Sequence, residues 1–455
     1  MTFNLKLAMQ LDHLLAPFIL NAEPTIPDVN VKGLVTDNRD VEAGDCFIAL
    51  AGIHHHGKEF IADAITRGAS VILLEGESLL EAGSAQQAEI SYQDNVPVIE
   101  INNLKDLLNK ILIRFYQNAD GDQSSVFDMR LLGVTGTNGK SSITRFAAQM
   151  SHGLNQATGL MGTLGFGVWP NIAESKNTTP ELAVLLRQFA LMKAQGAKQV
   201  AMEVSSHGIE QKRIENLTFD SAVFSNLTQD HLDYHGDMES YAQAKKQLFT
   251  GNAKHKIINH DDACGVNWLA EFSDAIAFSV RDDLSQHAEQ YIFASDLQFH
   301  NAGFQCQVNS SWGQGILRSQ LIGEFNISNV TAALASLLAL GYQLDALLEV
   351  APLLTPVCGR MELFNKSESA AFVVDYAHTH DALEQALKAL RVHCDGQLWC
   401  IYGCGGDRDK GKRPLMAQVA EQFADKTIIT DDNPRTEPAD LIINDILAGL
   451  KDAEQ

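Results

Sequence analysis

The chain has 455 residues, a length that predicts about three domains. Its 45% of hydrophobic and 20% of charged residues are typical of a globular enzyme and exclude a disordered chain. The formal net charge of −23 argues against nucleic acid and anionic membranes as partners, because both require a basic surface. It leaves room for a local basic pocket that binds a small anion.

The seven cysteines are scattered and form no C-x-x-C pair, which favours free thiols in a reducing compartment. Asp12 and His13 interrupt the apolar N-terminal run, so a signal peptide is not expected. The most apolar stretch, Val330 to Leu340, is shorter than the roughly 20 residues of a membrane span. We therefore expect a soluble, cytoplasmic protein without stable membrane insertion.

The first domain is expected over residues 1–122. Short strands at 45–50, 70–74 and 97–101 alternate with helical segments, which predicts an α/β unit. The polar residues 118–125 predict a linker to the next domain.

A central domain is expected over residues 123–356. A strand at 129–134 leads through a glycine-rich turn into a helix from Ser141, and further strands follow at 199–203, 222–226 and 256–259. This alternation predicts a parallel or mixed sheet with helices on both faces, closed by a buried helix at 329–340.

A third domain is expected over residues 357–455. Strands at 371–375, 398–402 and 426–430 alternate with helices at 381–391, 414–423 and 439–450, which is a Rossmann-like series with few strands. The fold class predicted for the whole chain is therefore α/β in three domains.

The segment Gly133-Val-Thr-Gly-Thr-Asn-Gly-Lys-Ser141 lies between an expected strand and an expected helix. Gly136 and Gly139 let backbone N–H groups turn toward a phosphate, and the helix N-terminus adds a partial positive charge. Lys140 would neutralise the β- and γ-phosphates, and the Ser141 hydroxyl would bind Mg²⁺. Although Val134 replaces the first glycine of a strict Walker A motif, this order of elements predicts a nucleotide site rather than an ordinary turn.

Metal-capable side chains follow two of the central strands. Glu203 ends the strand 199–203, and Asp230-His-Leu-Asp-Tyr-His235 follows the strand 222–226. A zinc site is one interpretation, but the lack of a cysteine and the proximity of the phosphate loop favour weakly bound Mg²⁺.

Other polar groups have simpler interpretations. The histidines at 54–56, and those at 378 and 380, are interpreted as polar turns because no carboxylate or cysteine stands at ligand spacing. Lys245 and Lys246 lie on an amphipathic helix at 241–249, and their residue type alone predicts solvated side chains.

Two loops of the third domain indicate an anion site. Residues 402–413 are rich in glycine and strongly basic within an acidic protein. In the next loop, 430–436, Asp432 can bind an ammonium and Arg435 a carboxylate, as recognition of a zwitterion requires. A solvated strand-to-helix loop is the alternative interpretation.

Taken together, these motifs resemble the Mur ligases, the ATP-dependent amide-forming enzymes of peptidoglycan synthesis. The resemblance covers nearly the whole chain. It is carried by Thr135-Gly-Thr-Asn-Gly-Lys140, Asn177-Thr-Thr179, Glu203-Val-Ser-Ser-His-Gly208, Asp230-His231, Tyr241-Ala-Gln-Ala-Lys245, Asn326-Ile-Ser-Asn329, Gly359-Arg360, Asp375-Tyr-Ala-His378 and Asp432-Asn-Pro-Arg435.

The resemblance implies a reaction and its participants. ATP would phosphorylate the D-Glu γ-carboxylate of UDP-MurNAc-L-Ala-D-Glu, and the amine of meso-diaminopimelate would attack the acyl phosphate and release phosphate. This step belongs to cell-wall synthesis, on which cell shape and division depend. The chain is expected to act on these small molecules as a monomer.

The resemblance also assigns roles to residues. The catalytic set is Lys140, Glu203, His231 and Lys245, the last carbamylated by CO₂, and the Mg²⁺ ligands are Ser141, Glu203, His231 and carbamylated Lys245. ATP would be bound by Gly136, Thr137, Asn138, Gly139, Lys140, Ser141, Ser142, Asn329, Arg360 and Asp375, with the third domain closing over the second. This role for Lys245 replaces the interpretation as a solvated lysine.

The same resemblance implies a site for the UDP-sugar peptide. Its residues would be Thr36, Asn38, His54, His55, Asn177, Thr178, Thr179, Ser205, Gln211 and Arg213. Asn38 stands where the family has serine, and His56 stands where it has the aspartate of an Asp-Gly pair. Because asparagine both donates and accepts hydrogen bonds, uridine binding is still expected.

Diaminopimelate would be bound by Arg408, Asp432, Asn433, Pro434 and Arg435. This amino acid carries a distal carboxylate that lysine lacks, and Arg435 can pair with it through two hydrogen bonds. The lysine-adding relatives lack this arginine. An unpaired arginine facing the ammonium of lysine would disfavour that substrate.

One departure from the family concerns the end of the sequence. The family continues for some tens of residues, through a Gly-Lys-Gly-His-Glu stretch that completes the amino-acid pocket and adds strands to the third sheet, whereas this sequence ends at Gln455. The third domain is therefore expected to be incomplete, with an exposed sheet edge and weakened stability and turnover. The alternatives to a diaminopimelate-adding ligase are a lysine-adding ligase, an inactive nucleotide-sugar-binding protein and a general phosphotransferase.

Overall fold

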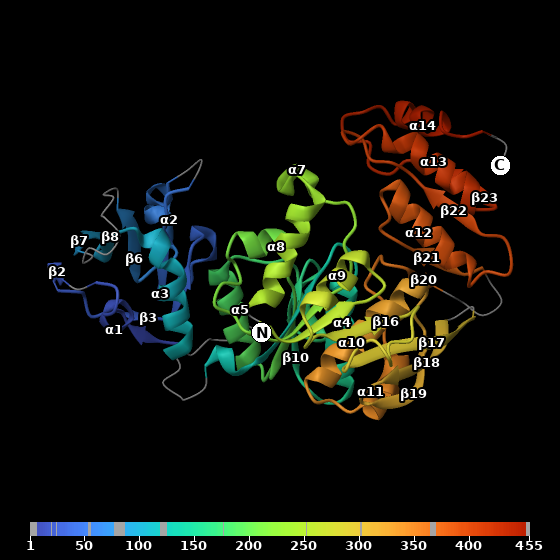
Figure 1. Cartoon of the computed structure of the whole chain (residues 1–455). Coiled ribbons are helices and arrows are strands. Elements are labelled where there is room, and N and C mark those ends of the chain that lie inside the picture. Colours follow the sequence, from blue (N-terminus) through green and yellow to red (C-terminus); the bar gives the residue numbers. More distant parts are fainter. Residues whose placement is uncertain are drawn as a thin grey trace. The chain divides into compact units, whose positions relative to one another are not determined.

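The computed structural model describes residues 7–19, 21–23, 25–52, 56–76, 87–118, 125–175, 177–251, 253–300, 303–364 and 370–451. The chain, whose helices and strands are labelled in Figure 1, forms two compact units. The first comprises Met1–Thr135, Asn155–Ala222 and Gln229–Lys254, and the second comprises Gly136–Leu154, Val223–Thr228 and His255–Gln455. Both units mix helices with strands, so the predicted α/β class is confirmed.

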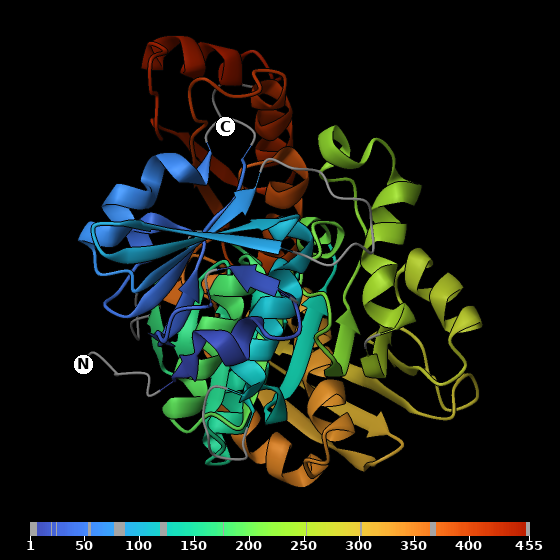
Figure 2. The ribbon, with the colours of Figure 1, turned by 90° about the vertical axis from the view of Figure 1, so that its left-hand side faces the viewer.

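The first unit contains a six-stranded sheet of order β2-β7-β8-β6-β5-β4, whose strands lie side by side in Figure 2. The strands are β2 (Asn21–Glu23), β4 (Gly33–Val35), β5 (Asp45–Ala49), β6 (Val71–Gly76), β7 (Gln87–Gln93) and β8 (Val96–Asn102). The chain runs parallel in β4, β5, β6 and β8, while β7 returns antiparallel to β8 through Asp94 and Asn95. The three predicted strands are confirmed as β5, β6 and β8; the other three were not predicted.

Three helices belong to the same part of the chain. They are α1 (Leu11–Leu15), α2 (Ile61–Thr66) and α3 (Leu104–Asn118), and a short pair of strands, β1 (Met9–Gln10) and β3 (Asn30–Val31), accompanies them. The predicted linker at 118–125 begins at the last residue of α3, and residues 119–124 lie outside the described residues.

A second sheet in the first unit has the neighbouring strands β12-β11-β10-β13-β9. They are β9 (Arg130–Thr135), β10 (Thr158–Gly162), β11 (Gly165–Val168), β12 (Asn171–Ala173) and β13 (Gln199–Glu203). The strands β9, β13 and β10 run parallel and are almost entirely buried, as expected for strands covered on both faces. The helices of this part are α5 (Leu182–Ala194), α6 (Ser206–Glu210), α7 (Leu232–His235) and α8 (Met238–Thr250).

Strand β14 (Phe219–Phe224) begins and ends earlier than the predicted strand at 222–226. Ser225 and Asn226 leave the strand because their side chains bond the loop that precedes α4 (Lys140–Gly153). The predicted boundary was wrong for these two residues, since their polar side chains serve a neighbouring loop instead of a sheet face.

In the second unit, β15 (Ala253–Asn259), β16 (Ile276–Ser279) and β17 (Tyr291–His300) are parallel neighbours. The sheet continues antiparallel with β18 (Gly303–Ser310) and β19 (Gly313–Ser319), so it is mixed. Its helices include α9 (Ala263–Glu271), α10 (Glu324–Ala339) and α11 (Leu344–Val350). The nearly apolar helix α10 is buried along most of its length and packs against α4, which confirms the buried helix predicted at 329–340.

The C-terminal part of the second unit has two pairs of strands. The pair β20 (Glu362–Phe364) and β21 (Phe372–Val374) is antiparallel, and the pair β22 (Trp399–Tyr402) and β23 (Lys426–Ile429) is parallel. The helices are α12 (His380–Arg391), α13 (Lys412–Phe423) and α14 (Ala439–Leu447), whose apolar residues pack into one core with β22. The predicted elements of this region are confirmed, with β20 as an unpredicted addition. On β22, Cys400 and Tyr402 face this core, whereas Trp399 and Ile401 are exposed.

Among the described residues, no helix combines the length and the apolar character that crossing a membrane requires.

A buried ion pair joins α5 to β5 in the first unit. Arg187 lies 2.8 Å from a carboxylate oxygen of Asp45, which is 3% exposed. The same carboxylate accepts the Glu42 N–H (2.9 Å), and Arg187 also pairs with the Glu42 carboxylate (2.8 Å). A buried carboxylate is tolerated only with such partners, so the arginine is required by Asp45.

Arg187→Met is expected to lower the free energy of unfolding by about 3 kcal/mol, because it leaves Asp45 buried without its cation. Urea denaturation measures the loss. Arg67→Met is the matched control, since Arg67 pairs with Asp63 on an exposed helix surface and its loss should cost less than about 1 kcal/mol. Equal costs for the two substitutions would contradict a structural role for the buried pair.

Candidate active site

The loop between β9 and α4 is held by the segment that follows β14. The Thr137 N–H donates to the Asn226 carbonyl (2.9 Å), and the Asn138 N–H donates to the Asn226 side-chain oxygen (2.9 Å). The Thr137 hydroxyl donates to the Thr228 carbonyl (3.1 Å) and accepts the Thr228 N–H (3.0 Å). These reciprocal bonds fix the path of the loop backbone.

Close packing around this loop requires two of its glycines. Gly136 has a φ of 142°, and a Cβ atom there would overlap the Ser225 hydroxyl. Gly139 has a φ of 88°, and a Cβ atom there would lie 2.5 Å from the Asn329 side-chain oxygen. Without these side chains the backbone N–H groups can approach a phosphate closely.

Lys140 begins α4 and turns back over the loop. Its ammonium donates to the carbonyls of Gly136 (2.9 Å) and Thr137 (2.8 Å). Ser141 and Ser142 follow in the first turn of α4, where the helix N-terminus attracts anions. The sequence-predicted ATP residues from Gly136 to Ser142 and Asn329 are therefore neighbours.

Two further residues assigned to ATP, Arg360 and Asp375, lie together beside β20 and β21. The Asp375 carboxylate accepts the N–H groups of Met361 (2.8 Å) and Ala377 (2.9 Å). The Arg360 guanidinium lies 4.8 Å from the ring centroid of Tyr376, a cation–π distance. Asp375 thus ties the segment before β20 to the turn after β21.

Glu203 is the last residue of β13, and only 2% of its surface is exposed. Its carboxylate accepts the N–H of Thr163 (2.9 Å) and the hydroxyl of the same residue (3.2 Å). The Thr163 hydroxyl also lies 2.9 Å from the hydroxyl of Thr178. A carboxylate oriented in this way at a strand end is suited to bind a hard cation.

Residues assigned to the UDP-sugar peptide surround the same strand end. The Thr179 hydroxyl donates to the Glu203 carbonyl (3.0 Å) and accepts the Ser205 N–H (3.0 Å). Arg213 donates to the Thr179 carbonyl (2.6 Å) and to the Gln211 side-chain oxygen (2.5 Å). The structure therefore brings five of the assigned residues into one group with Glu203: Thr178, Thr179, Ser205, Gln211 and Arg213. Asn177, which precedes Thr178 in the chain, is exposed.

Three histidines gather beside Tyr241. The ring centroid of His207 lies 5.0 Å from that of His231 and 5.5 Å from that of His235. The Tyr241 ring centroid lies 4.9 Å from that of His235 and 6.1 Å from that of His231. Partial burial, together with the neighbouring histidines, lowers the pKa of His207, which favours its neutral form.

Lys245 is 1% exposed on α8, and its ammonium nitrogen lies 4.2 Å from the ring centroid of Tyr241. The prediction of a solvated side chain, made from residue type alone, was therefore wrong for Lys245. His231 and Lys245, two of the assigned residues, therefore both lie near the ring of Tyr241. Lys246, the next residue, is only half-buried.

The N-terminal residues assigned to uridine are partly described. Thr36 and Asn38 are half-buried directly after β4. The Asn38 amide donates to the Asp63 carboxylate (2.7 Å), and this bond, followed by that from Arg67, lowers the pKa of Asp63. His54 and His55 lie outside the described residues.

His56, which stands where the family has an aspartate, caps the short helical turn at Gly57–Phe60. Its ring nitrogen Nδ1 accepts the N–H of Lys58 (3.1 Å), and its own N–H donates to the Glu59 carboxylate (3.1 Å), which completes a capping box. A Cβ atom at Gly57 would lie 2.7 Å from the backbone of Ala49. The pair His56-Gly57 is thus explained by a helix cap and a close backbone approach.

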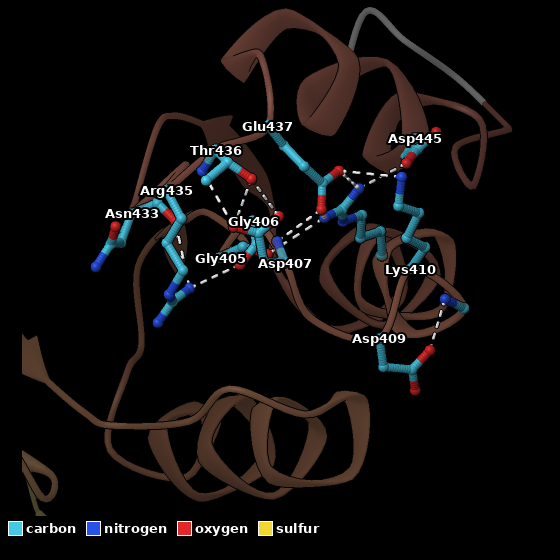
Figure 3. A network of polar contacts seen from close by, with 12 residues as sticks. Gly405, Gly406, Asp407, Asp409, Lys410, Asn433, Arg435, Thr436, Glu437 and Asp445 are labelled. Atoms are coloured by element: carbon cyan, nitrogen blue, oxygen red, sulfur yellow. Dashed lines mark hydrogen bonds and ion pairs between the residues drawn. The ribbon is translucent and has the colours of Figure 1, made fainter.

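The residues assigned to diaminopimelate lie on two loops of the C-terminal part, and two of them, Asn433 and Arg435, are labelled in Figure 3. Arg408 and Asp432 are exposed, and so are Asn433 and Arg435, while Pro434 is half-buried. The Arg435 guanidinium donates to the Gly406 carbonyl (2.8 Å), and its backbone has a φ of 50°. The structure therefore brings both loops, and with them both arginines, to one end of β22 and β23.

Several neighbours of these residues were not predicted from the sequence. They are Thr163, Asn226, Thr228 and Glu437, which lie far in the sequence from the groups to which they are bonded. A group of possible metal ligands, His260, Asp261 and Asp282, was also missed; their ligand atoms lie within 4.8 Å of one another.

Comparisons with known proteins show the family of the chain. Three family profiles match the chain: "Mur ligase family, catalytic domain" over residues 30–116, "Mur ligase middle domain" over 134–337 and "Mur ligase, glutamate ligase domain" over 359–455. A curated UDP-N-acetylmuramoyl-L-alanyl-D-glutamate–2,6-diaminopimelate ligase of Haemophilus influenzae strain PittGG is 45% identical over 429 residues, which are 94% of this chain and 86% of that protein. The chain belongs to the Mur ligase family. The protein of the same description from strain 86-028NP is 46% identical to this Mur ligase over the same shares.

Solved structures of Mur ligases share the fold. A structure described as UDP-N-acetylmuramoyl-L-alanyl-D-glutamate–2,6-diaminopimelate ligase matches with a TM-score of 0.71 and 34% identity, over 98% of this chain and 86% of that one. A ligase of Acinetobacter baumannii that is described as adding D-alanyl-D-alanine matches with a TM-score of 0.70 over 99% and 89%, at 16% identity. The second likeness concerns the fold alone.

Gly139→Ala is expected to weaken ATP binding by about tenfold or more, because the new methyl group meets Asn329 and displaces the loop backbone. Gly196→Ala is the matched control, since Gly196 also has a φ of 88° but nothing lies within 4 Å of its Cβ position. Both variants bear the left-handed strain of about 1 kcal/mol, and only the first has the clash. Calorimetric titration with ATP separates them; unchanged affinity in Gly139→Ala would contradict a phosphate site in this loop.

Proposed function

We propose that this Mur ligase joins meso-diaminopimelate to the D-Glu γ-carboxylate of UDP-MurNAc-L-Ala-D-Glu at the expense of ATP. The observation that carries the proposal is the 45% identity, over 94% of this chain, to curated ligases described by that addition. The reaction proceeds through an acyl phosphate, which the amine attacks to form a tetrahedral intermediate that expels phosphate. It supplies a precursor for peptidoglycan, and so serves cell-wall synthesis, cell shape and cell division.

ATP is held by the loop from Gly136 to Ser142 in this proposal. The glycines let the backbone approach the phosphates, and Lys140, which lies over the loop, neutralises charge on the transferred phosphoryl group. Asn329 contacts the adenine side, and Arg360 and Asp375 contact the γ-phosphate and the ribose. The catalytic work of these residues is positioning and charge stabilisation.

The side chains that would hold Mg²⁺ are Ser141, Glu203, His231 and Lys245. Glu203 fits this role because its buried carboxylate is already oriented by Thr163, and a hard cation prefers oxygen ligands. When bound, Mg²⁺ would stabilise the negative charge that develops during phosphoryl transfer.

Lys245 suits carbamylation, because its amine is buried beside Tyr241 instead of being solvated. The ammonium first loses a proton, and the neutral amine then adds to CO₂ and releases a second proton, so that an anion with two oxygens replaces the cation. Such an anion can bind a metal cation, which an ammonium cannot, and His231, another of the proposed ligands, lies near the same tyrosine ring.

The UDP-sugar peptide is bound by Asn177, Thr178, Thr179, Ser205, Gln211 and Arg213 in this proposal, with Thr36, Asn38, His54 and His55 on the uridine. Arg213 carries the positive charge of the group, and its bonds to Thr179 and Gln211 orient it. The γ-carboxylate of D-Glu thereby reaches the strand end that carries Glu203.

The choice of amino acid rests on Arg408 and Arg435, together with Asp432, Asn433 and Pro434. Two exposed guanidinium groups on adjacent loops can pair with the distal carboxylate of diaminopimelate. Asp432 is placed for the ammonium of the same end. Lysine has no distal carboxylate and would leave the arginines without a partner.

We further propose that the chain works as a monomer in the cytoplasm, in three domains over residues 1–122, 123–356 and 357–455. The family profiles support this division, because they end or begin within about twenty residues of these boundaries (116, 134, 337 and 359).

Phosphate release from ATP tests the proposed reaction. With UDP-MurNAc-L-Ala-D-Glu present, release is expected with meso-diaminopimelate. It should be at least about a hundredfold slower with L-lysine, because lysine lacks the carboxylate that pairs with the two guanidinium groups, and hydrogen bonds to charged groups contribute about 1.5–3 kcal/mol each. Faster release with L-lysine would contradict the role assigned to Arg435, although the chain would still be a Mur ligase. Absence of release with either amino acid would contradict the ligase.

Carbon-13-labelled bicarbonate tests the modification of Lys245. A carbamate signal in the NMR spectrum is expected in the unaltered protein and in Lys246→Met, whose lysine is only half-buried, but not in Lys245→Met. Circular dichroism checks that both variants are folded. A signal that persists in Lys245→Met would place the carbamate elsewhere.

A further inference from the structure

Two loops in the C-terminal part of the chain are bonded directly to each other. They are residues 403–411, between β22 and α13, and residues 430–437, after β23. The Gly406 N–H donates to the Asn433 carbonyl (2.8 Å), and the Thr436 N–H (3.1 Å) and hydroxyl (2.8 Å) donate to the Asp407 carboxylate. Figure 3 shows these groups converging between the loops.

We call this set of bonds between the two loops the junction. The side chain of Arg413, next to it, is fully buried. Its guanidinium donates to both carboxylate oxygens of Glu437 (3.0 and 3.1 Å), to Asp445 (2.8 Å) and to the Gly405 carbonyl (3.3 Å). Arg413 therefore holds one end of each loop, through Gly405 in the first and Glu437 in the second.

Glu437 connects the arginine to the backbone of the first loop. One of its oxygens accepts the Asp407 N–H (2.6 Å) as well as a bond from Arg413. The hydrogen bond from Arg413, and then that from Asp407, lower the pKa of Glu437 to about 2. The carboxylate thus remains ionised, and an acceptor for both donors, at neutral pH.

These bonds fix the backbone positions from which the side chains of the two exposed arginines extend. Arg408 follows Asp407 directly, and Arg435 precedes Thr436 directly, so each is adjacent to a residue that the junction fixes. Arg435 also donates across the gap to the Gly406 carbonyl (2.8 Å). A displacement of either loop would change the distance between the two guanidinium groups.

We propose that Arg413 and Glu437 are positioning residues, which hold Arg408 and Arg435 at the separation that matches the distal carboxylate of the amino-acid substrate. This inference rests on the proposed function, because it takes the two arginines as the groups that read that carboxylate. An ion pair suits the task better than an apolar contact, since directional bonds fix both loops while leaving the arginines exposed for substrate.

Two matched substitutions test the proposal: Glu437→Gln and Asp445→Asn. Each replaces a carboxylate that accepts from Arg413 by its amide, but only Glu437 also accepts from the loop that carries Arg408. In Glu437→Gln the amide NH₂ must face an N–H group of Arg413 in either orientation of the side chain, and in one orientation it also faces the Asp407 N–H, so the bonds between the two loops are weakened.

In Glu437→Gln, the KM for diaminopimelate is expected to rise about tenfold, while the KM for ATP stays unchanged. Asp445→Asn should leave both values near those of the unaltered enzyme. Thr436→Val, which removes only the hydroxyl bond to Asp407, should give a smaller rise of about threefold. A merely structural role would lower the melting temperature without separating the two KM values, and that result would overturn the proposal.

Hydrogen exchange separates a failure of this inference from a failure of the proposed function. The amides of Gly406, Asp407 and Thr436 should exchange at least tenfold faster in Glu437→Gln than in Asp445→Asn. Unchanged exchange would overturn the inference even if diaminopimelate is a substrate. If the unaltered enzyme released phosphate with lysine alone, the proposed specificity and this inference would both be overturned.

Discussion

The loop before α4 can carry no side chain at Gly136 or Gly139, and much of the surrounding structure follows from that restriction. Because Gly136 lacks a Cβ atom, Ser225 can approach and donate to the Asn138 carbonyl (2.5 Å). The Ser225 carbonyl in turn accepts the Asn259 amide (2.6 Å) at the end of β15. A chain of hydrogen bonds therefore connects the ends of strands β14 and β15 to the phosphate loop. These bonds give the glycine-rich loop one defined backbone path.

A second feature of this strongly acidic chain is that arginines with little exposed surface pair with carboxylates. Arg187 and Arg413 each meet two carboxylates, and each of them joins segments that are distant in the sequence. Such pairs add little stability relative to well-packed apolar groups, but breaking them is costly and their geometry is directional. In this Mur ligase the second pair lies directly behind the loops that carry Arg408 and Arg435, where a defined geometry matters most for recognition.

Features that depend on neighbours in the sequence were predicted well. The phosphate loop follows from the spacing of two glycines, a lysine and a serine between a strand and a helix, and all of those elements are present. The helices α12, α13 and α14 follow from their apolar periodicity. The strands β18 and β19 were missed. They follow each other through a turn without a helix between them, and such strands are harder to recognise in a sequence than the regular alternation of strands and helices around them.

The candidate site was predicted less completely for a different reason. Lys245 looks like a solvated lysine on an amphipathic helix, and only the packing of α8 shows that its side chain is buried on Tyr241. His56 looks like a surface histidine, and only the structure shows it as a helix cap in place of an aspartate. Thr163, Arg413 and Glu437 carry no local motif, so their support of Glu203 and of the two exposed arginines could not be recognised.

The sequence by itself determined the α/β class, the phosphate loop, the order of the C-terminal elements and the family, because these depend on local spacing and on the motifs that the chain carries. The tertiary structure alone decided which groups meet. It placed Asn329 against Gly139, His231 and Lys245 on one tyrosine ring, and Glu437 between two loops that are separated by about twenty residues. Contacts of this kind depend on the packing of segments far apart in the chain, and a polar side chain shows in isolation neither its burial nor its partner.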